Sequence, residues 1–255
     1  MKKEINESQD QINLNLEFDL KAGLISALYE FAKNIDKSIQ LLEFKTKTEN
    51  SKSNKPNQKE SEQYSGDVLI TLTTEPFLLH KSVHKKIELI YEMIIASKIP
   101  LDAAYEILGN EEDILKEILT DKEAHRNIER NLNQVEKASK IMLGEMKNYG
   151  LKGICITSFD LSPLKIFSKE YKLKDIYQIL RNIGFIPEIQ PFEWVYRQSF
   201  INNNPIWLFI IKSGVGPTIH HTLFETYFYL LIVEPNSYLG EFPKKVIERF
   251  NQILG

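Results

Sequence analysis

The stretch from Phe18 to Ile35 constrains the fold of this chain most strongly, because its residue pattern fits a buried helix. Its large apolar residues recur at spacings of four, three and four, which places them on one stripe of an α-helix: Leu24, Leu28, Phe31 and Ile35. Small residues let a helix lie close to its neighbour, and this helix has Gly23, Ser26 and Ala27. We predict that it packs tightly on a sheet of the same chain. The alternative is a face that docks a partner.

The residues around this helix are predicted to complete a domain over residues 12–99. Strand patterns occur at Ile12–Phe18, Ser38–Thr48 and Asp67–Thr74. An amphipathic helix follows, with its apolar stripe on Leu79, Val83, Ile87, Ile90 and Ile94. Residues 1–11 and 49–65 are polar and lack apolar periodicity, so we expect a disordered tail and a mobile loop. A basic recognition loop at 49–65 is the less favoured alternative, because acidic residues nearly balance its lysines.

Residues 100–149 are predicted to be a helical connector. A short helix, Leu101–Leu108, is followed by Gly109, and Asn110 is expected to cap a second helix with an acidic first turn. One longer helix is expected over Asp121–Tyr149, where apolar residues recur at heptad-like steps. We predict that it packs across one or both flanking domains as a connector. A partner-binding helix is the alternative.

Residues 150–255 are predicted to form a second domain of strands and helices. The order is strand, strand, helix, strand, strand, strand and helix, at Ile154–Phe159, Leu164–Ser168, Leu173–Ile183, Glu193–Phe200, Ile206–Lys212, Thr226–Val233 and Phe242–Leu254. Turn residues at Asn202–Pro205 indicate a hairpin, and Ser213–His221 is expected to be a loop.

The composition is that of a globular chain and argues against several classes of function. Hydrophobic residues make up 42% and charged residues 26% of the 255 positions, so the chain can bury a core. A net charge of −3 provides no concentrated positive field for nucleic acid. Its one cysteine, Cys155, is predicted to be a buried, unreactive thiol in a strand, which suits a reducing cytoplasm. No signal peptide or apolar run of roughly 20 residues is visible, so we predict a cytoplasmic protein that reaches membranes only through another molecule.

No motif in the sequence carries recognisable catalytic, cofactor-binding or metal-binding chemistry, so we predict no site residues of these kinds. His80 and His84 have the i, i+4 spacing of a two-histidine metal site, but no third ligand lies at matching spacing. The adjacent His220 and His221 point apart on an extended backbone. The glycine loop Gly214–Pro217 lacks the GK[ST] sequence and the following helix that phosphate binding requires.

The order of elements in the second half resembles the topology of the longin and roadblock-like group, in which an antiparallel five-stranded sheet packs between helices. The first half resembles the same plan in the segments FDLKAGLISALYEFAKNI, SIQLLEFKTKT, GDVLITLTT and LLHKSVHKKIELIYEMII. Its first helix with an LISAL core, followed by a strand that begins with GD, looks like archaeal longin-domain proteins. The likeness covers residues 12–97 and 151–254. It implies an α+β chain with two longin-like domains, each an antiparallel sheet with flanking helices, joined by the connector.

The resemblance also implies a scaffold without catalytic residues or cofactors, which binds other longin or roadblock modules and small GTPases in membrane trafficking or related signalling. Edge strands of antiparallel sheets accept further strands, and exposed helix faces dock helices. A second interpretation is a profilin-like or PAS-like sensor of a small ligand, which needs a cavity beneath Trp194, Tyr196 and Trp207. An enzyme, the third, needs convergent polar groups such as His220 and His221 beside acidic residues.

Overall fold

The computed structural model describes residues 22–28, 30, 70, 72–98, 107, 109–219, 223–235 and 237–255. The chain divides into two units, Met1–Leu69 and Ile70–Gly255. In the first unit the described residues are helical, as the pattern of Phe18–Ile35 predicts, and Gly23, Ser26 and Ala27 are exposed. The strands predicted at residues 12–18 and 38–48 and the loop predicted at 49–65 lie outside the described residues.

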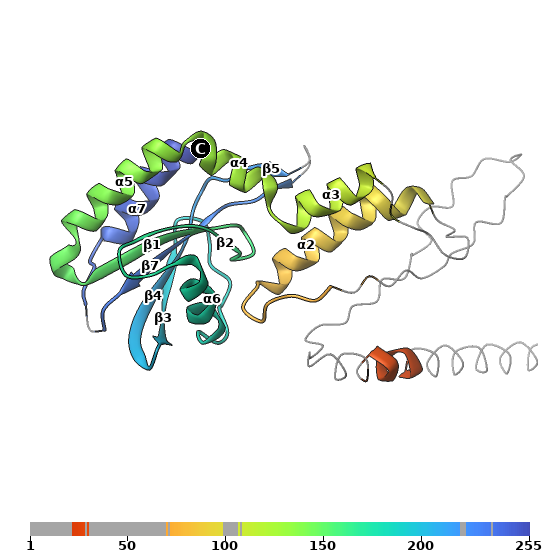
Figure 1. Cartoon of the computed structure of the whole chain (residues 1–255), viewed down its shortest axis with the longest axis horizontal. Helices are drawn as coiled ribbons and strands as arrows, with labels where there is room; N and C mark the ends of the chain where they lie inside the picture. Colours follow the sequence, from red (N-terminus) through yellow and green to blue (C-terminus); the bar gives the residue numbers. More distant parts are fainter. Residues whose placement is uncertain are drawn as a thin grey trace, which may run out of the picture. The chain divides into compact units, whose positions relative to one another are not determined.

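The second unit is built on one antiparallel sheet of five strands (Figure 1). The strands are β1 (Leu151–Thr157), β2 (Pro163–Ser168), β3 (Trp194–Ile201), β4 (Asn204–Lys212) and β7 (Phe228–Val233). Their order across the sheet is β2-β1-β7-β4-β3, so the last strand of the sheet along the chain lies in the middle. A central strand with both faces covered needs apolar residues at every position, and all six residues of β7, FYLLIV, are buried.

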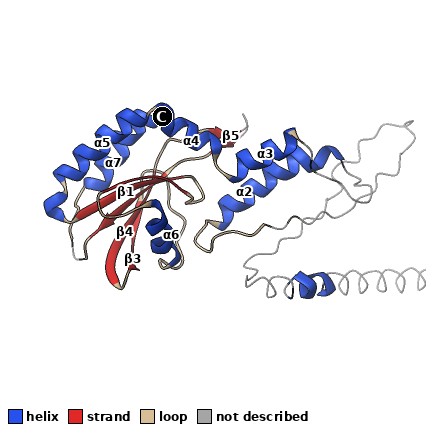
Figure 2. Ribbon diagram, in the orientation of Figure 1, coloured by secondary structure: helices blue, strands red, loops and turns tan. Residues whose placement is uncertain are grey.

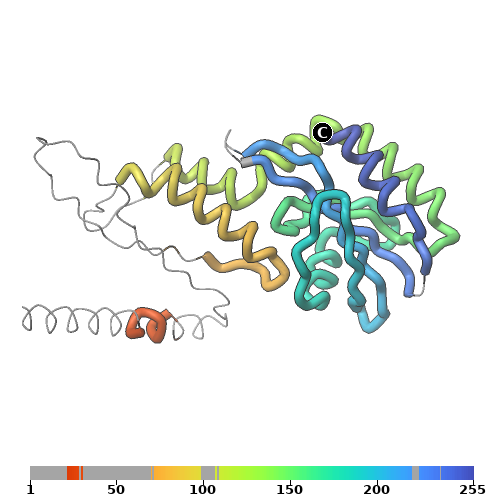
Figure 3. Tube along the Cα trace, turned by 180° about the vertical axis from the view of Figure 1, so that it is seen from behind, coloured from red at the N-terminus to blue at the C-terminus, as the bar shows by residue number. Residues whose placement is uncertain are grey.

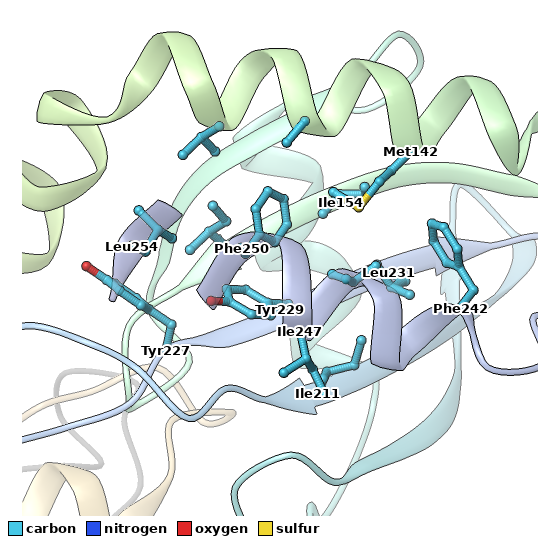
Figure 4. Packing of buried hydrophobic residues seen from close by; sticks show 14 of the residues in the cluster. Met142, Ile154, Ile211, Tyr227, Tyr229, Leu231, Phe242, Ile247, Phe250 and Leu254 are labelled. Carbon is cyan, nitrogen blue, oxygen red and sulfur yellow. The ribbon is translucent and has the colours of Figure 1, made fainter. Parts of the chain in front are cut away.

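Helices cover both faces of this sheet (Figure 2). One face carries α5 (Leu132–Glu145) and α7 (Phe242–Leu254), which lie side by side (Figure 3), and the other carries α6 (Leu173–Arg181). Alternate residues of β1 point into the two layers: Ile154 and Ile156 join the cluster beneath α5 and α7, and Cys155 joins the cluster beneath α6. Figure 4 shows the first cluster, in which the rings of Tyr229 and Phe250 lie 5.0 Å apart.

A group of shorter elements precedes the sheet along the chain. They are α2 (His80–Ile90), the π-helical turn η1 (Tyr91–Ile95), the 3₁₀ turn η2 (Ala96–Lys98), α3 (Asn110–Leu119) and α4 (Lys122–Arg130). Two short pieces complete the unit, the 3₁₀ turn η3 (Lys147–Tyr149) and the ribbon of β5 (Thr218–Ile219) and β6 (Leu223–Phe224). Apolar residues of α2, η1 and α3 form a third buried cluster with Phe159 and Ile219.

The α+β class and the order of elements after residue 150 are confirmed. Each strand and helix predicted there is present, with ends shifted by a few residues at most. The β5–β6 ribbon is an addition, because Ser213–His221 was expected to be a loop. A second sheet in residues 12–97 is not confirmed, since most of those residues lie outside the described part of the chain.

Three predictions before residue 150 are wrong in detail. The helix predicted over Asp121–Tyr149 is broken at Asn131 into α4 and α5, and ends in η3. Asn110 is the first residue of α3 rather than its cap, a position that Gly109 takes with φ 41°. Of the strand predicted at Asp67–Thr74, the described residues 70 and 72–74 have no strand structure, because none of them pairs with a described strand.

Candidate interaction surface

The two edges of the sheet differ in how they are covered. At one edge, β2 contacts α5 on one face and α6 on the other. At the opposite edge, β3 pairs with β4 on one side and with no described strand on the other. The backbone groups on its outer side therefore face away from the sheet. Two of them are occupied by side chains: the carbonyl oxygen of Tyr196 accepts a hydrogen bond from Arg197 at 2.9 Å, and that of Phe200 accepts one from Asn182 at 3.4 Å.

A tight turn sets the position of β3 against β4. The two strands are joined by Asn202 and Asn203, whose φ angles of 48° and 63° are those of a two-residue hairpin turn. Asparagine tolerates this left-handed backbone, which explains why both turn positions carry it. The resulting register places Tyr196 opposite Phe209 and continues without interruption from Ile201 back to Trp194.

One face of β3 is buried and the other is open. Ser199 is fully buried beneath α6, and its Oγ donates a hydrogen bond to the carbonyl oxygen of Ile179 at 2.7 Å. Tyr196 and Phe200 point to the opposite face, where they are 59% and 47% exposed. Alternation along the strand therefore separates a core row from a solvent-facing aromatic row.

Exposure of the open face increases towards the edge, because the layer of α5 and α7 does not reach β3. In the row formed by cross-strand neighbours, Leu231 of β7 is fully buried, Phe209 of β4 is half-buried and Tyr196 of β3 is exposed. The ring of Tyr196 stacks on Trp207 with 5.7 Å between centroids and lies 5.9 Å from Phe209. We call the side chains of Tyr196, Phe200, Trp207 and Phe209 the aromatic surface.

The opposite side of the free edge carries a further exposed aromatic residue. Phe185, which follows α6, is 84% exposed, and its carbonyl oxygen accepts a hydrogen bond from Nε of Arg197 at 3.3 Å. Large exposed aromatic side chains beside a free strand edge are typical of protein-binding surfaces.

The residues considered for other kinds of site can be placed in part. The burial of Cys155 in a strand is confirmed, and Nε2 of His84 lies 3.2 Å from Oε1 of Glu88. His220 and His221 lie outside the described residues. Within the described ranges, no three His, Cys, Asp or Glu side chains are grouped as metal binding requires. The loop Gly214–Pro217 does lie between two strands, β4 and β5.

Neither of two pockets in this unit fits the ligand-sensing interpretation. A groove of about 300 Å³ lies between α5 and α7, with Ile141, Met142 and Phe242 among its lining residues. A second pocket, of about 20 Å³, lies beside Asp121 and has room for a water molecule. Neither is lined by Trp194, Tyr196 or Trp207.

Sequence reasoning considered Trp194 and Trp207 as part of a ligand cavity, and both are half-buried in the sheet. It missed the exposure of Tyr196 and Phe200, because alternation along a strand does not tell which face a helix covers. None of the described helices combines the length and apolar character needed to cross a bilayer. No family model, curated protein or solved structure matches the chain.

Proposed function

We propose that this chain is a non-enzymatic protein-interaction module, and that its partner binds at the free edge of β3 and the aromatic surface. The observation that carries the proposal is the row of exposed aromatic side chains on a strand with one unpaired edge. A partner strand that adds to β3 gains backbone hydrogen bonds from the edge and displaces the side chains of Arg197 and Asn182 from two of its carbonyl oxygens. Its side chains gain apolar contacts with Tyr196 and Phe200.

The arrangement of layers supports a longin-like or roadblock-like interpretation of residues 150–255 together with α5, which comes from the predicted connector. A five-stranded antiparallel sheet lies between α6 on one face and α5 with α7 on the other, which is the plan that the resemblance implies. On this basis we propose partners of two kinds, another module of the same group or a small GTPase, and a role in trafficking or related signalling. The proposed action takes place in the cytoplasm.

The test measures binding of the full chain to purified small GTPases of the source organism, each loaded with GDP or a non-hydrolysable GTP analogue. We expect at least one GTPase to bind in one nucleotide state. The double substitution Tyr196→Ala and Phe200→Ala should weaken that binding by about 10-fold or more, because exposed aromatic anchors dominate interface energies. Isothermal titration calorimetry gives the affinity directly.

Tyr149→Ala is the matched control, since Tyr149 is 60% exposed and lies outside the aromatic surface. It should leave the affinity unchanged. Failure of every GTPase to bind, together with a tightly held small molecule that copurifies, would instead support the ligand-sensing interpretation. Equal weakening by the control and the double variant would show that the aromatic surface is not the binding site.

A further inference from the structure

A lysine in the middle of α2 is buried together with two aspartates. Lys86 is 3% exposed, and its Nζ lies 2.8 Å from Oδ1 of Asp121 and 2.6 Å from Oδ2 of Asp160. The ammonium group also lies 5.4 Å from the centroid of the Phe159 ring. Both aspartates are more than nine-tenths buried, so water screens these charges very little.

The three charged groups come from three different parts of the unit. Lys86 is on α2, Asp121 forms the joint between α3 and α4, and Asp160 is in the turn between β1 and β2. Further bonds link α2 to that turn: Ser82 Oγ donates to the carbonyl oxygen of Phe159 at 2.9 Å. The cluster therefore fastens α2 and the α3–α4 joint to the end of the sheet.

The two aspartates are held differently. Asp160 Oδ1 accepts hydrogen bonds from the Ser158 hydroxyl and from the backbone N–H of Ser162, at 2.8 Å for the latter. Both carboxylate oxygens of Asp121 contact Nζ of Lys86, Oδ2 at 2.9 Å and Oδ1 at 2.8 Å, but in the described structure only Oδ2 has the geometry of a hydrogen bond. Asp121 also has a left-handed backbone, with φ 52°. Its carboxylate is thus the less stabilised of the two.

The cluster carries one positive and two negative charges, and the charged groups that surround it do not offset the difference. On the neighbouring elements, Lys85 pairs with Glu225, and Lys122 pairs with Glu117. Arg126 pairs with Glu123. Because each of these pairs is neutral, an excess of one negative charge remains buried at the cluster.

We infer that Asp121 binds a proton that neutralises this excess charge and so strengthens the attachment of α2 and the α3–α4 joint to the sheet. With this proton bound, the carboxyl group of Asp121 is neutral and carries a hydroxyl. Lys86 and Asp160 then form a neutral ion pair. A buried pair of opposite charges is less unfavourable than a buried triad with a net charge.

The electrostatic environment agrees with this assignment. Burial and the negative charge of Asp160 outweigh the attraction of Lys86, and together they raise the pKa of Asp121 to about 6. For Asp160, burial acts in the same direction, but Lys86 and the bonds from Ser158 and Ser162 prevail and hold its pKa below the usual range. Lys86 keeps its charge, because the two carboxylates outweigh its burial and raise its pKa.

The sign of the pH effect follows from the raised pKa of Asp121. Between about pH 4 and pH 6 the folded chain holds a proton that the unfolded chain releases, so this group stabilises the fold as the pH falls through 6. Between pH 7.5 and pH 5, the proton should lower the equilibrium constant for unfolding by about 10-fold. The contribution is lost again as the pH rises above 6.

The test compares the full wild-type chain with Asp121→Asn by chemical unfolding at several pH values between 5 and 7.5. Titration of other groups affects both proteins equally, so the difference between them isolates Asp121. On acidification from pH 7.5 to pH 5, we expect the equilibrium constant for unfolding of the wild-type chain to fall about 10-fold relative to that of the variant. Asp113→Asn, an exposed aspartate of α3, should follow the wild-type profile.

Two measurements on the wild-type chain keep the test valid if the variant does not fold. Carbon-13 NMR of the aspartate carboxyl groups should show Asp121 titrating near pH 6. Hydrogen exchange, corrected for its intrinsic pH dependence, should show greater protection of α2 relative to β7 at pH 5 than at pH 7.5. The inference would be overturned if the stability of the wild-type chain and of Asp121→Asn depended on pH in the same way. It would also be overturned if the carboxyl group of Asp121 titrated below pH 4.5.

Discussion

Cys155 shows how burial controls the chemistry of one side chain. It lies in β1 between the sheet and α6 with no exposed area, and burial raises the pKa of its thiol far above the usual range. Thiolate is the reactive form, so the native thiol should be almost inert. We expect a thiol reagent such as DTNB to label the folded chain at least about 100-fold more slowly than the guanidinium-unfolded chain, in line with protection by a stable core. Rapid labelling under native conditions would show that this part of the core opens readily.

Lys86 illustrates which residues sequence patterns identify and which they miss. Its position lies beside the apolar stripe of α2, between Val83 and Ile90, so spacing alone already places it on the inner face. Charged residues are rarely buried, so a lysine at this position would ordinarily be expected to face solvent. The partners that permit its burial, Asp121 and Asp160, lie 35 and 74 residues further along the chain, and no local pattern links them to it.

At the level of elements, two glycines show different limits on an alanine substitution. Tertiary packing decides its effect at one of them, and local backbone preference decides it at the other. Gly216, in the loop between β4 and β5, has the carbonyl oxygen of Glu225 only 1.9 Å from where a Cβ atom would lie. Gly144, near the end of α5, is exposed with nothing within 4 Å of that position. Gly216→Ala should therefore lower the free energy of unfolding by about 2 kcal/mol or more, because the backbone must move.

Gly144→Ala is the matched control, with the same chemical change in an open helical position. It should raise the free energy of unfolding by about 0.5–1 kcal/mol, because alanine favours the helix. Urea unfolding followed by circular dichroism measures both effects. A Gly216→Ala chain as stable as the wild type would mean that the loop moves without cost.

The strands and helices after residue 150 could be predicted because each has a strong local signal. Strand alternation, the Asn202–Asn203 turn and the glycine that follows α6 at position 184 all act over a few residues. The break at Asn131 was missed because the same apolar stripe continues on both sides of it, in α4 and α5. The position of the open face was missed for a different reason. Exposure of Tyr196 depends on where α5 and α7 end over the sheet, which is a tertiary property.

At the level of the whole molecule, the described cores are concentrated in one unit. All three clusters of buried apolar residues lie between Phe77 and Leu254, and the two larger ones share the central strand β7. A unit with its own core on both faces of a sheet has what independent folding requires.

We therefore predict that the fragment Ile70–Gly255 folds without Met1–Leu69, the other unit of the chain. It should unfold in one cooperative transition, with a Tm within about 5 °C of the corresponding transition in the full chain, because its buried clusters are retained. Circular dichroism during heating gives both values, and binding of the dye ANS reports exposed apolar surface. A fragment that binds ANS strongly and melts without cooperativity would show that residues 1–69 contribute to this core. A fragment that folds but loses GTPase binding would instead place part of the partner site in the first unit, even with the aromatic surface intact.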